Sequence, residues 1–381
     1  MTALFQNYNR RPIHLVKGQG SYVWDEQEKK YLDFTSGIAV LALGHCSPIL
    51  VQAMKEQSEK LWHTSNLFTN TEQEKLAASL VKDTHLAHGF FCNSGTEANE
   101  AAIKLARKHT KKHKMITFIN SFHGRTFGAM SATGQEKVHS GFGPIVETFE
   151  YLPFNDVKAL QAAADEDTAA IMLEVVQGEG GVNPVTPEFA QAIQTICDEK
   201  GILLIVDEVQ TGIARTGTRF AFEQTALKPN IVTLAKGLGG GFPIGAMLGT
   251  ADLFDSFSAG THGSTFGGNQ MAVAIAQTVI DTTFNETFLE NVQASASYLK
   301  EQLALHIPQA EIRGMGLLVG LGLKQPIPQV VEACEQAGML VVGAGTSTLR
   351  LLPPLNVSKE EIDEAVAILK EILVEKQVVT E

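Results

Sequence analysis

Between about residues 89 and 250, short runs of apolar and β-branched residues alternate with longer segments whose apolar positions recur at helical spacing. Such short runs are typical of buried strands, and strands that alternate with helices indicate a mostly parallel sheet covered by helices. Six runs fit this description: Gly89–Cys92, Met115–Ile119, Ile171–Val176, Ile202–Val206, Ile231–Leu234 and Ala246–Gly249. The pattern therefore predicts an α/β domain in this part of the chain.

Capping residues mark the beginnings of helices on both sides of this region. Thr71 and Glu74 have the spacing of a capping box, which predicts a helix that begins at Thr71. Ser358 and Glu361 have the same spacing before the last amphipathic segment of the chain. Near the N-terminus, residues 13–34 contain two alternating runs around a polar turn, which is the pattern of a β-hairpin.

The 381 residues are enough for two domains, since one domain typically takes about 100–200 residues. The composition changes at a loop rich in Gly, Ser and Thr, 259–269, after which the pattern becomes a long helical run and a short α+β section. We therefore expect an N-terminal segment, 1–48, that packs with the small domain, a large domain, 49–261, and a small C-terminal domain, 262–381.

Composition and charge narrow the class of partner. A net charge of −12 and a pI of about 5.4 disfavour a nucleic acid or an anionic membrane surface as a partner. The four cysteines are scattered without metal-ligand spacing, which suits a reducing cytoplasm and predicts no metal site. The N-terminus lacks the pattern of a signal peptide, and no apolar run approaches the ~20 residues that span a bilayer. We therefore expect a cytoplasmic protein that acts on small molecules.

In open α/β sheets, ligands bind beyond the carboxyl ends of the strands, so the residues that follow each predicted strand are the candidates for chemistry. Ser94, Gly95 and Thr96 follow the first strand and begin a helix. The free N–H groups and the dipole of a helix N-terminus can hold a phosphate. An ordinary N-cap is the commoner alternative, since Ser94 and Glu97 also have capping-box spacing.

Two further turns carry aromatic and charged residues. Phe122, His123 and Arg125 follow the second strand, where they can stack against a ring and bind a carboxylate in a bidentate manner. A surface turn with an incidental arginine is equally consistent with this segment. Glu179 lies in a Gly-flanked loop after the third strand, and for this motif taken alone a simple turn is the commoner explanation.

The last two strand ends carry a carboxylate and an amine. Asp207 ends an almost wholly apolar strand, where a carboxylate is costly to bury without a cationic partner such as a protonated ring nitrogen. Lys236 follows the next strand, and a desolvated lysine there would have a lowered pKa and act as a nucleophile or base, although a surface lysine is the alternative. A phosphate cradle, a stacking aromatic, a buried carboxylate, a reactive lysine and arginines together are what a pyridoxal-phosphate site requires.

Motifs along nearly the whole chain closely resemble those of the class III (ornithine-type) aminotransferases. They are 31–34, 37–45, 93–99, 122–126, 177–181, 207–212, Lys236, 262–269 and 350–355. The resemblance implies fold type I of the pyridoxal-phosphate-dependent transferases, with a mostly parallel seven-stranded sheet in the large domain and a smaller α+β C-terminal domain. It also implies a homodimer in which the two subunits share their active sites.

The resemblance further implies roles for individual residues. Lys236 and Asp207 would be catalytic. Contacts with pyridoxal 5'-phosphate are implied for Ser94, Gly95, Thr96, Phe122, Asp207, Gln210, Lys236 and, from the neighbouring subunit, Thr265. Arg125 would bind the substrate carboxylate remote from the reacting amine. Arg350 would bind the α-carboxylate of glutamate, and Glu179 would neutralise Arg350 when the other substrate is bound.

The reaction implied is transamination of N2-acetyl-L-ornithine with 2-oxoglutarate, in arginine biosynthesis. The apolar Ile38 suits a capped α-amine better than a charged one, while Leu41, where the family often has asparagine, leaves the acyl-group preference open. Other donors within the family are free ornithine, 4-aminobutyrate and succinyl-diaminopimelate, and a semialdehyde aminomutase would need no 2-oxoglutarate. A nicotinamide-dependent reductase is disfavoured because no Gly-x-Gly-x-x-Gly opens the first βα unit. The third class of function is that of a binding or regulatory protein, a relative of the family without catalytic activity.

Overall fold

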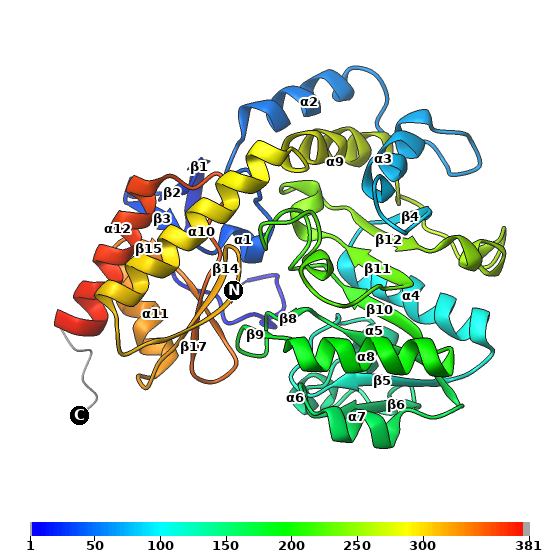
Figure 1. Ribbon diagram of the computed structural model, residues 1–381. Coiled ribbons are helices and arrows are strands. Elements are labelled where there is room, and N and C mark those ends of the chain that lie inside the picture. The colour runs from blue at the N-terminus through cyan, green and yellow to red at the C-terminus, as the bar shows by residue number, and fades with distance from the viewer. Residues whose placement is uncertain (1, 376–381) are drawn as a thin grey trace.

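A computed structural model describes residues 2–375, and its largest element is a seven-stranded sheet (Figure 1). All neighbouring strands are parallel except β12, which runs antiparallel to both of its neighbours. The strand order is β4 (His88–Cys92), β12 (Gly245–Gly249), β11 (Ile231–Leu234), β10 (Leu203–Asp207), β7 (Thr168–Leu173), β5 (Lys114–Phe118) and β6 (Phe149–Leu152). The predicted α/β class, with a mostly parallel seven-stranded sheet, is confirmed.

All six strands expected from the apolar pattern lie in this sheet, and two details differ. The seventh strand, β6, lies at the sheet edge and is mostly half-buried, so its four residues show no continuous apolar run. The run predicted over Ile171–Val176 is divided, because β7 ends at Leu173. Val176 and Gln177 form β8 and pair instead with β9 (Asn183–Pro184).

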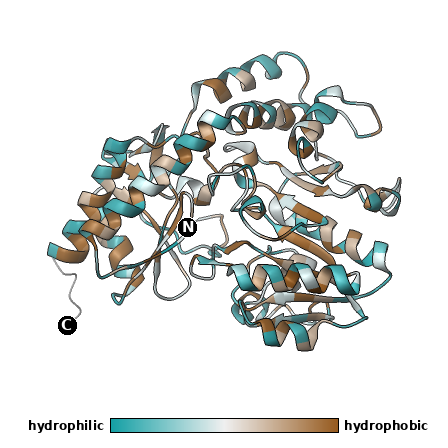
Figure 2. Cartoon of the chain, in the orientation of Figure 1, coloured by the Kyte–Doolittle hydropathy of each residue, from teal (hydrophilic) through white to brown (hydrophobic). Residues whose placement is uncertain are grey.

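Helices cover both faces of the sheet, and the alternation of side chains along each strand divides the core between those faces. Met172 and Ile205 pack in a cluster with the apolar face of α4 (Gly95–Thr110). Ile171 and Val206, one position along in each strand, belong to the larger cluster that includes α8 (Pro187–Lys200). Figure 2 shows the same arrangement, with apolar strands in the interior and polar residues on the outer faces of the helices.

The helix-capping predictions are confirmed in one case and corrected in another. Ser358 and Glu361 form the predicted capping box at the start of α12 (Lys359–Lys370). The helix predicted to begin with Thr71 as its cap, α3 (Thr71–Val81), is capped instead by Asn70, whose side chain accepts a hydrogen bond from the N–H of Gln73 at 3.2 Å. An asparagine one residue earlier in extended conformation is the better N-cap, so Thr71 is the first helical residue.

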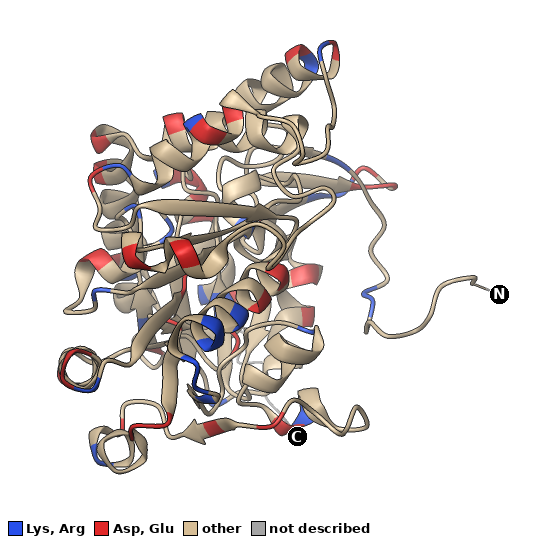
Figure 3. Cartoon of the chain, turned by 90° about the vertical axis from the view of Figure 1, so that its right-hand side faces the viewer, with Lys and Arg blue, Asp and Glu red and all other residues tan. Residues whose placement is uncertain are grey.

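The C-terminal part of the chain is built on a second sheet, with strand order β13 (Glu311–Met315), β14 (Leu318–Gly322), β17 (Thr348–Leu351) and β16 (Val342–Ala344). The predicted N-terminal hairpin forms as β1 (Leu15–Gln19), β2 (Tyr22–Asp25) and β3 (Lys30–Asp33), and β3 pairs with β15 (Met339–Leu340). The N-terminal segment is therefore joined by strand pairing to the C-terminal part. In Figure 3 the residues before β1 extend away from the body of the molecule.

The remaining helices connect and cover these sheets. They are α1 (Ser36–Ala39), α2 (Pro48–Ser58), α5 (Phe127–Ala132), α6 (Glu136–His139), α7 (Val157–Ala163), η1 (Ala221–Gln224), η2 (Lys236–Gly239), η3 (Ala251–Phe257), α9 (Gln270–Thr283), α10 (Glu286–His306), α11 (Ile327–Gln336) and η4 (Glu371–Glu375). Within residues 2–375, none of the helices has both the length and the apolar composition that a membrane span requires.

Helix α9 bears on the division into domains. Its buried residues, among them Val273 and Ile280, belong to the cluster that covers the seven-stranded sheet, and the helix packs beside α2 and α3. The predicted division into 1–48, 49–261 and 262–381 stays a prediction. On the basis of this packing, we propose that α9 belongs to the large domain.

Candidate active site

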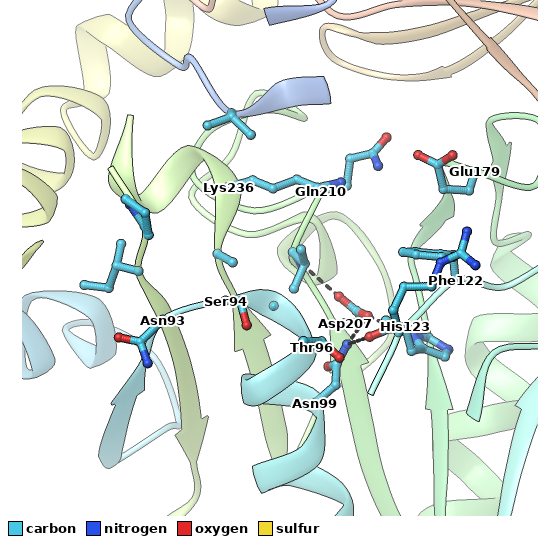
Figure 4. Close-up of a pocket in the computed structure, with 18 of the residues that line it drawn as sticks. Asn93, Ser94, Thr96, Asn99, Phe122, His123, Glu179, Asp207, Gln210 and Lys236 are labelled. Carbon is cyan, nitrogen blue, oxygen red and sulfur yellow. Dashed lines mark hydrogen bonds and ion pairs between the residues drawn. The ribbon is translucent and has the colours of Figure 1, made fainter. Parts of the chain in front are cut away.

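A cavity of about 440 Å³ opens at the carboxyl ends of the parallel strands of the large sheet. The segments that leave β4, β5, β7, β10 and β11 all contribute to its wall, and they bring together residues as far apart in the sequence as Asn93 and Ile244. Nine of the predicted site residues line it: Ser94, Gly95, Thr96, Phe122, Arg125, Glu179, Asp207, Gln210 and Lys236 (Figure 4). This is the place where open α/β sheets bind their ligands.

Two predicted residues lie outside this wall. Arg350, on β17, reaches the site through Glu179 and Gln210, which both accept hydrogen bonds from its guanidinium. Thr265 lies exposed on the loop before α9 and does not line the cavity of its own chain. The prediction assigned Thr265 to the site of a neighbouring subunit, and that assignment stays a prediction.

Lys236 follows β11 after one intervening residue and begins the short 3₁₀ helix η2, with a φ of 43°. Its side chain enters the cavity and points toward Gln210 (Figure 4). Within residues 2–375, no hydrogen-bond or ion-pair partner is recorded for its amine. Burial lowers the pKa of Lys236 to about 8, although the negative charge of Glu179 opposes that shift. A larger fraction of this lysine than of an exposed lysine is therefore the neutral amine near physiological pH.

In the cofactor-free protein we expect the amine of Lys236 to be acylated at lower pH than exposed lysines, whose reference pKa is about 10.4. A lowered pKa enriches the neutral, nucleophilic amine as the pH rises toward 8. Brief acetic anhydride treatment across a pH series, followed by peptide mass spectrometry, would compare Lys236 with the exposed Lys55. A labelling midpoint for Lys236 at or above that of Lys55 would contradict the expectation.

Asp207 ends β10 and lies at the centre of a buried hydrogen-bond network. Its Oδ2 accepts hydrogen bonds from Asn99 Nδ2 at 2.8 Å and from His123 Nδ1 at 2.8 Å. Its Oδ1 accepts the N–H of Val209 at 3.0 Å, and Asn99 is in turn held by the hydroxyl of Thr233. These contacts fix the carboxylate at the cavity wall without neutralising it by a lysine or arginine.

His123 is fully buried, and burial alone would disfavour its imidazolium form. The hydrogen bond and negative charge of Asp207, together with the charge of Glu174, outweigh burial and raise the pKa of His123. Glu174 is itself buried and lines the cavity, and it accepts the N–H of Phe122 at 3.1 Å. Burial raises the pKa of Glu174 to about 8, against the opposing charge of His123.

The sequence assigned no role to Asn99 or Glu174, and it did not predict the contact of His123 with Asp207. His123 and Asn99 each stand inside a motif that was singled out, but their contact with Asp207 spans 84 and 108 residues of sequence. Glu174 is hidden in a run that was predicted to be an uninterrupted strand. A charged residue within an otherwise apolar run was the one signal available for it.

The N-terminus of α4 forms another side of the cavity. Ser94 caps the helix and accepts the N–H of Glu97 at 3.3 Å, so the ordinary capping role is confirmed. Gly95 and Thr96 occupy the first turn and also line the cavity. A side chain at position 95 would collide with Val209, since a Cβ there would lie 2.7 Å from its Cγ1. This close approach keeps the helix start, with its free N–H groups, against the cavity.

The cavity is closed toward the small sheet by an ion pair. Arg350 Nη1 lies 2.6 Å from Glu179 Oε1 and 3.0 Å from Gln210 Oε1, and the arginine side chain is 1% exposed. Burial tends to raise the pKa of Glu179, but the charge of Arg350 outweighs it and lowers that pKa. On the outer side, the exposed Arg125 lies over the Phe122 ring, with its Cζ 5.5 Å from the ring centroid.

Residues 5–373 match the family model described as aminotransferase class-III. A protein of Bacillus cereus named acetylornithine aminotransferase is 52% identical over 379 residues, covering 98% of each chain. The chain belongs to the class-III aminotransferases. A relative of the same name from Halalkalibacterium halodurans is 53% identical over 377 residues, again with 98% of each chain covered.

Solved structures give the same family. Ornithine aminotransferase from Toxoplasma gondii superposes with a TM-score of 0.93 at 33% identity, covering 98% of this chain and 94% of that one. N-acetylornithine aminotransferase from Stenotrophomonas maltophilia gives a TM-score of 0.84 at 37% identity, with 97% of each chain covered. The likeness extends over both the large and the small sheet, so the recognised fold is confirmed.

Class-III aminotransferases use pyridoxal 5'-phosphate, and the donor set of this cavity fits that cofactor. The start of α4 offers N–H groups to a phosphate, and Asp207 offers a fixed carboxylate to a ring nitrogen. Lys236 offers an amine without a competing partner among the described residues. The class-III aminotransferase site therefore contains, in one cavity, each kind of group that the cofactor needs.

Proposed function

We propose that this class-III aminotransferase transfers the δ-amino group of N2-acetyl-L-ornithine to 2-oxoglutarate, giving N-acetyl-L-glutamate 5-semialdehyde and L-glutamate. The observation that carries the choice of substrate is the group of relatives named acetylornithine aminotransferase, at 52–53% identity over nearly the full length. We infer a place in arginine biosynthesis from the same relatives. The ion pair of Glu179 with Arg350 is consistent with a site that accepts two different donors in turn.

The proposed reaction assigns each cavity residue a physical task. When bound, pyridoxal phosphate supplies an aromatic ring that accepts electrons from the substrate carbon. Ser94, Gly95 and Thr96 would hold its phosphate, and the fixed carboxylate of Asp207 would hold a proton on its ring nitrogen. Lys236 Nζ would hold the cofactor and move the proton at the reacting carbon, for which a pKa near 8 is suitable. Phe122 and Gln210 would contact the ring and its phenolic oxygen.

The two arginines would distinguish the two amino donors. For glutamate, Arg350 would bind the α-carboxylate and Arg125 the distant carboxylate, each with the paired N–H groups of a guanidinium. For N2-acetylornithine, the δ-amine enters first, so no carboxylate reaches Arg350 and Glu179 would keep it neutralised at 2.6 Å. Arg125, exposed at the outer side of Phe122, would then bind the α-carboxylate.

Free ornithine is the second candidate donor, and one observation favours it. The ornithine aminotransferase of Toxoplasma gondii superposes with the higher TM-score of the two structures compared above, 0.93 against 0.84. A shared fold does not fix the substrate, which depends on the cavity wall. In this chain Val40 lines the cavity, whereas Ile38, the residue predicted to discriminate, is 38% exposed and lies outside it.

The test is a comparison of amino donors with the purified protein and pyridoxal phosphate. N2-acetylornithine, ornithine, 4-aminobutyrate and succinyl-diaminopimelate would each be supplied with 2-oxoglutarate, and glutamate would be measured. We expect the highest kcat/KM with N2-acetylornithine. A higher value with ornithine would move the assignment to the second candidate. Repeated turnover without 2-oxoglutarate would indicate an aminomutase, because an aminotransferase without a keto acid stops after one half-reaction.

We also propose that the protein is a homodimer. Large apolar side chains at Leu61, Trp62, Leu67, Phe68 and Phe266 are 46–88% exposed, which is unusual for a surface that faces only water. Phe266 adjoins Thr265, the residue predicted to reach the neighbouring site. The expected mass in solution is twice 41.1 kDa, measurable by light scattering. The cytoplasmic location stays a prediction.

We expect removal of the Glu179 carboxylate to change the balance between the two donors. In Glu179→Ala, Arg350 loses its partner at 2.6 Å and would present an unpaired cation to every substrate. The kcat/KM for N2-acetylornithine should fall by about tenfold or more, since an unpaired buried charge costs well over 1.4 kcal/mol. The value for glutamate should fall less or rise. Equal losses for the two donors, measured as separate half-reactions, would contradict the proposed role.

A further inference from the structure

Arg215 is a buried arginine that the proposed reaction does not use. It lies in the loop 212–217, eight residues after Asp207, and is 2% exposed. Within residues 2–375, no carboxylate forms an ion pair with it. Burial accordingly lowers the pKa of its guanidinium to about 9. A buried cation without a carboxylate is costly, so its presence calls for a specific set of contacts.

The contacts of Arg215 are with backbone carbonyl groups of the small sheet. Its Nη1 donates to the carbonyl of Pro353 at 2.6 Å and to that of Leu317 at 3.2 Å, while Nη2 is buried without a partner among the described residues. Leu317 precedes β14 and Pro353 follows β17, two antiparallel strands in which Val319 pairs with Leu351. The guanidinium therefore joins the ends of two paired strands.

The backbone of the same loop holds the same strand ends. The N–H of Leu317 donates to the carbonyl of Arg215 at 3.0 Å. Gly316, with a φ of +54°, packs so closely that a Cβ there would lie 2.4 Å from the carbonyl carbon of Thr216. Such a separation is available only to glycine. The backbone of the loop 212–217 therefore packs directly against the backbone of the turn before β14.

The loop is also the point where the two hydrophobic cores meet. Ile213 packs in the cluster that covers the large sheet, and the next residue, Ala214, packs in the cluster of the small domain. Both residues have positive φ values, 54° and 65°, which residues other than glycine seldom adopt. Strained backbone of this kind persists only where the surrounding structure holds it in place.

We propose that Arg215 is a positioning residue that fixes Arg350, and with it the binding site for the α-carboxylate of the dicarboxylate substrate, relative to the cofactor cavity. Arg350 lies on β17, three residues before Pro353 along the chain, and Gln210 lies five residues before Arg215 in the segment that follows β10. Arg350 and Gln210 contact each other at 3.0 Å. The hydrogen bonds of Arg215 to Leu317 and Pro353, which we call the clamp, therefore hold together the two segments that carry Arg350 and Gln210.

This inference rests on the proposed function for the role of Arg350, and it predicts a selective defect. A dicarboxylate must meet Arg350 and Arg125 at a fixed separation, so a shift of β17 weakens its binding. N2-acetylornithine does not require Arg350, because Glu179 keeps that arginine paired. Loss of the clamp should therefore affect glutamate, 2-oxoglutarate and their analogues more than the acetylated donor.

The experiment uses Arg215→Met, which keeps an unbranched side chain but removes the guanidinium, and Arg215→Lys, which keeps the charge. The control is Arg219→Met: Arg219, four residues along the chain and half-buried, also donates to two backbone carbonyls, those of Lys82 at 2.7 Å and Asp83 at 3.2 Å, and pairs with Glu223 at 2.8 Å. Within residues 2–375 it makes no hydrogen bond with the small sheet. Glutarate, which has both carboxylates of glutamate and no amine, is titrated calorimetrically into each protein supplied with pyridoxal phosphate.

We expect Arg215→Met to weaken glutarate binding by about tenfold or more, equivalent to ~1.4 kcal/mol, with an intermediate loss in Arg215→Lys and no loss in Arg219→Met. The KM for glutamate should rise in parallel, while the KM for N2-acetylornithine changes by less than about threefold. Equal glutarate affinity in Arg215→Met and Arg219→Met, or equal changes in both KM values, would overturn the inference. If Arg215→Met does not fold, Arg215→Lys decides by the same comparison.

The glutarate measurement separates this inference from the proposed function. If the wild-type protein fails to use N2-acetylornithine but the Arg215 variants lose glutarate affinity, the substrate assignment is wrong and the positioning role stands. If N2-acetylornithine is used and glutarate affinity is unchanged in the variants, the proposed function stands and the positioning role is wrong.

Discussion

Lys236→Ala is expected to lose transamination by about 10⁴-fold or more, because the variant lacks both the amine that would hold the cofactor and the group that would move the proton. The structure leaves no substitute for it. Within residues 2–375, Lys236 is the one lysine that lines the cavity. The other cations at or beside the cavity, Arg125 and Arg350, are guanidinium groups, which do not supply a neutral amine.

The measurement is a single-turnover assay, in which glutamate is mixed with excess protein and formation of 2-oxoglutarate is followed. The matched control is Lys228→Ala, which removes an exposed lysine three residues before β11. Both variants should keep the thermal midpoint of the wild type within a few degrees, since neither removes a recorded side-chain contact. A folded Lys236→Ala that turns over within tenfold of the control would remove the lysine from the mechanism.

The fold was predictable wherever local chemistry determines local structure. Ser358 and Glu361 lie three residues apart and cap a helix by contacts within that interval, so the sequence carries the whole signal. The run Ile231–Leu234 is buried on both faces, and its continuous apolar character marks a central strand. β6 has one buried residue in four and lies at the edge, so its pattern does not differ from that of a loop.

The site was predictable for a different reason, which is the geometry of parallel sheets. Because parallel strands end at one edge, the residues after five separate strands had to meet, and nine predicted residues line one cavity. The contacts behind that wall were not predictable. Asn99 meets Asp207 through the packing of α4 against the sheet, and His123 meets it from the segment after β5. No spacing in the sequence encodes a hydrogen bond across 84 or 108 residues.

Arg215 shows the same limit more sharply. Its partners are the carbonyl groups of Leu317 and Pro353, which every residue type possesses, so the sequence contains no complementary side chain that could have pointed to the contact. A buried arginine is recognised from sequence when a carboxylate is available at a helical or cross-strand spacing. An arginine bound by backbone alone is visible only in the folded chain.

Asp207→Asn is expected to lower turnover by about 10³-fold, because a neutral amide cannot hold a proton on a ring nitrogen by charge. The hydrogen-bond network adds a second effect. Oδ2 faces the N–H groups of Asn99 and His123, and Oδ1 faces the N–H of Val209. An asparagine must direct its NH₂ group at one of these two sets of donors, which leaves buried polar groups unpaired at a cost of about 1–3 kcal/mol.

The pKa of His123 gives a readout that does not depend on turnover. Asp207 raises that pKa against the effect of burial, so Asp207→Asn should lower it, and the imidazolium should lose its proton at lower pH. Nitrogen-15 NMR of the cofactor-free protein measures this directly. Unfolded His123 titrates near its reference value of about 6.5, so the stability that its raised pKa contributes is present below that pH and lost as the pH rises through the folded pKa. The variant should lack this pH-dependent increment.

Glu208→Gln is the matched control, since Glu208 is the adjacent residue and is equally buried but faces away from the cavity. Its carboxyl accepts the hydroxyl of Thr211 and the N–H of Phe222, and burial raises its pKa to about 7, so a neutral amide resembles its protonated form. Turnover should change by less than about tenfold and the pKa of His123 should stay unchanged. Comparable losses in the two variants would mean that the site needs a buried acid on this strand end for packing. A loss confined to Asp207→Asn would mean that it needs a charge at one atom.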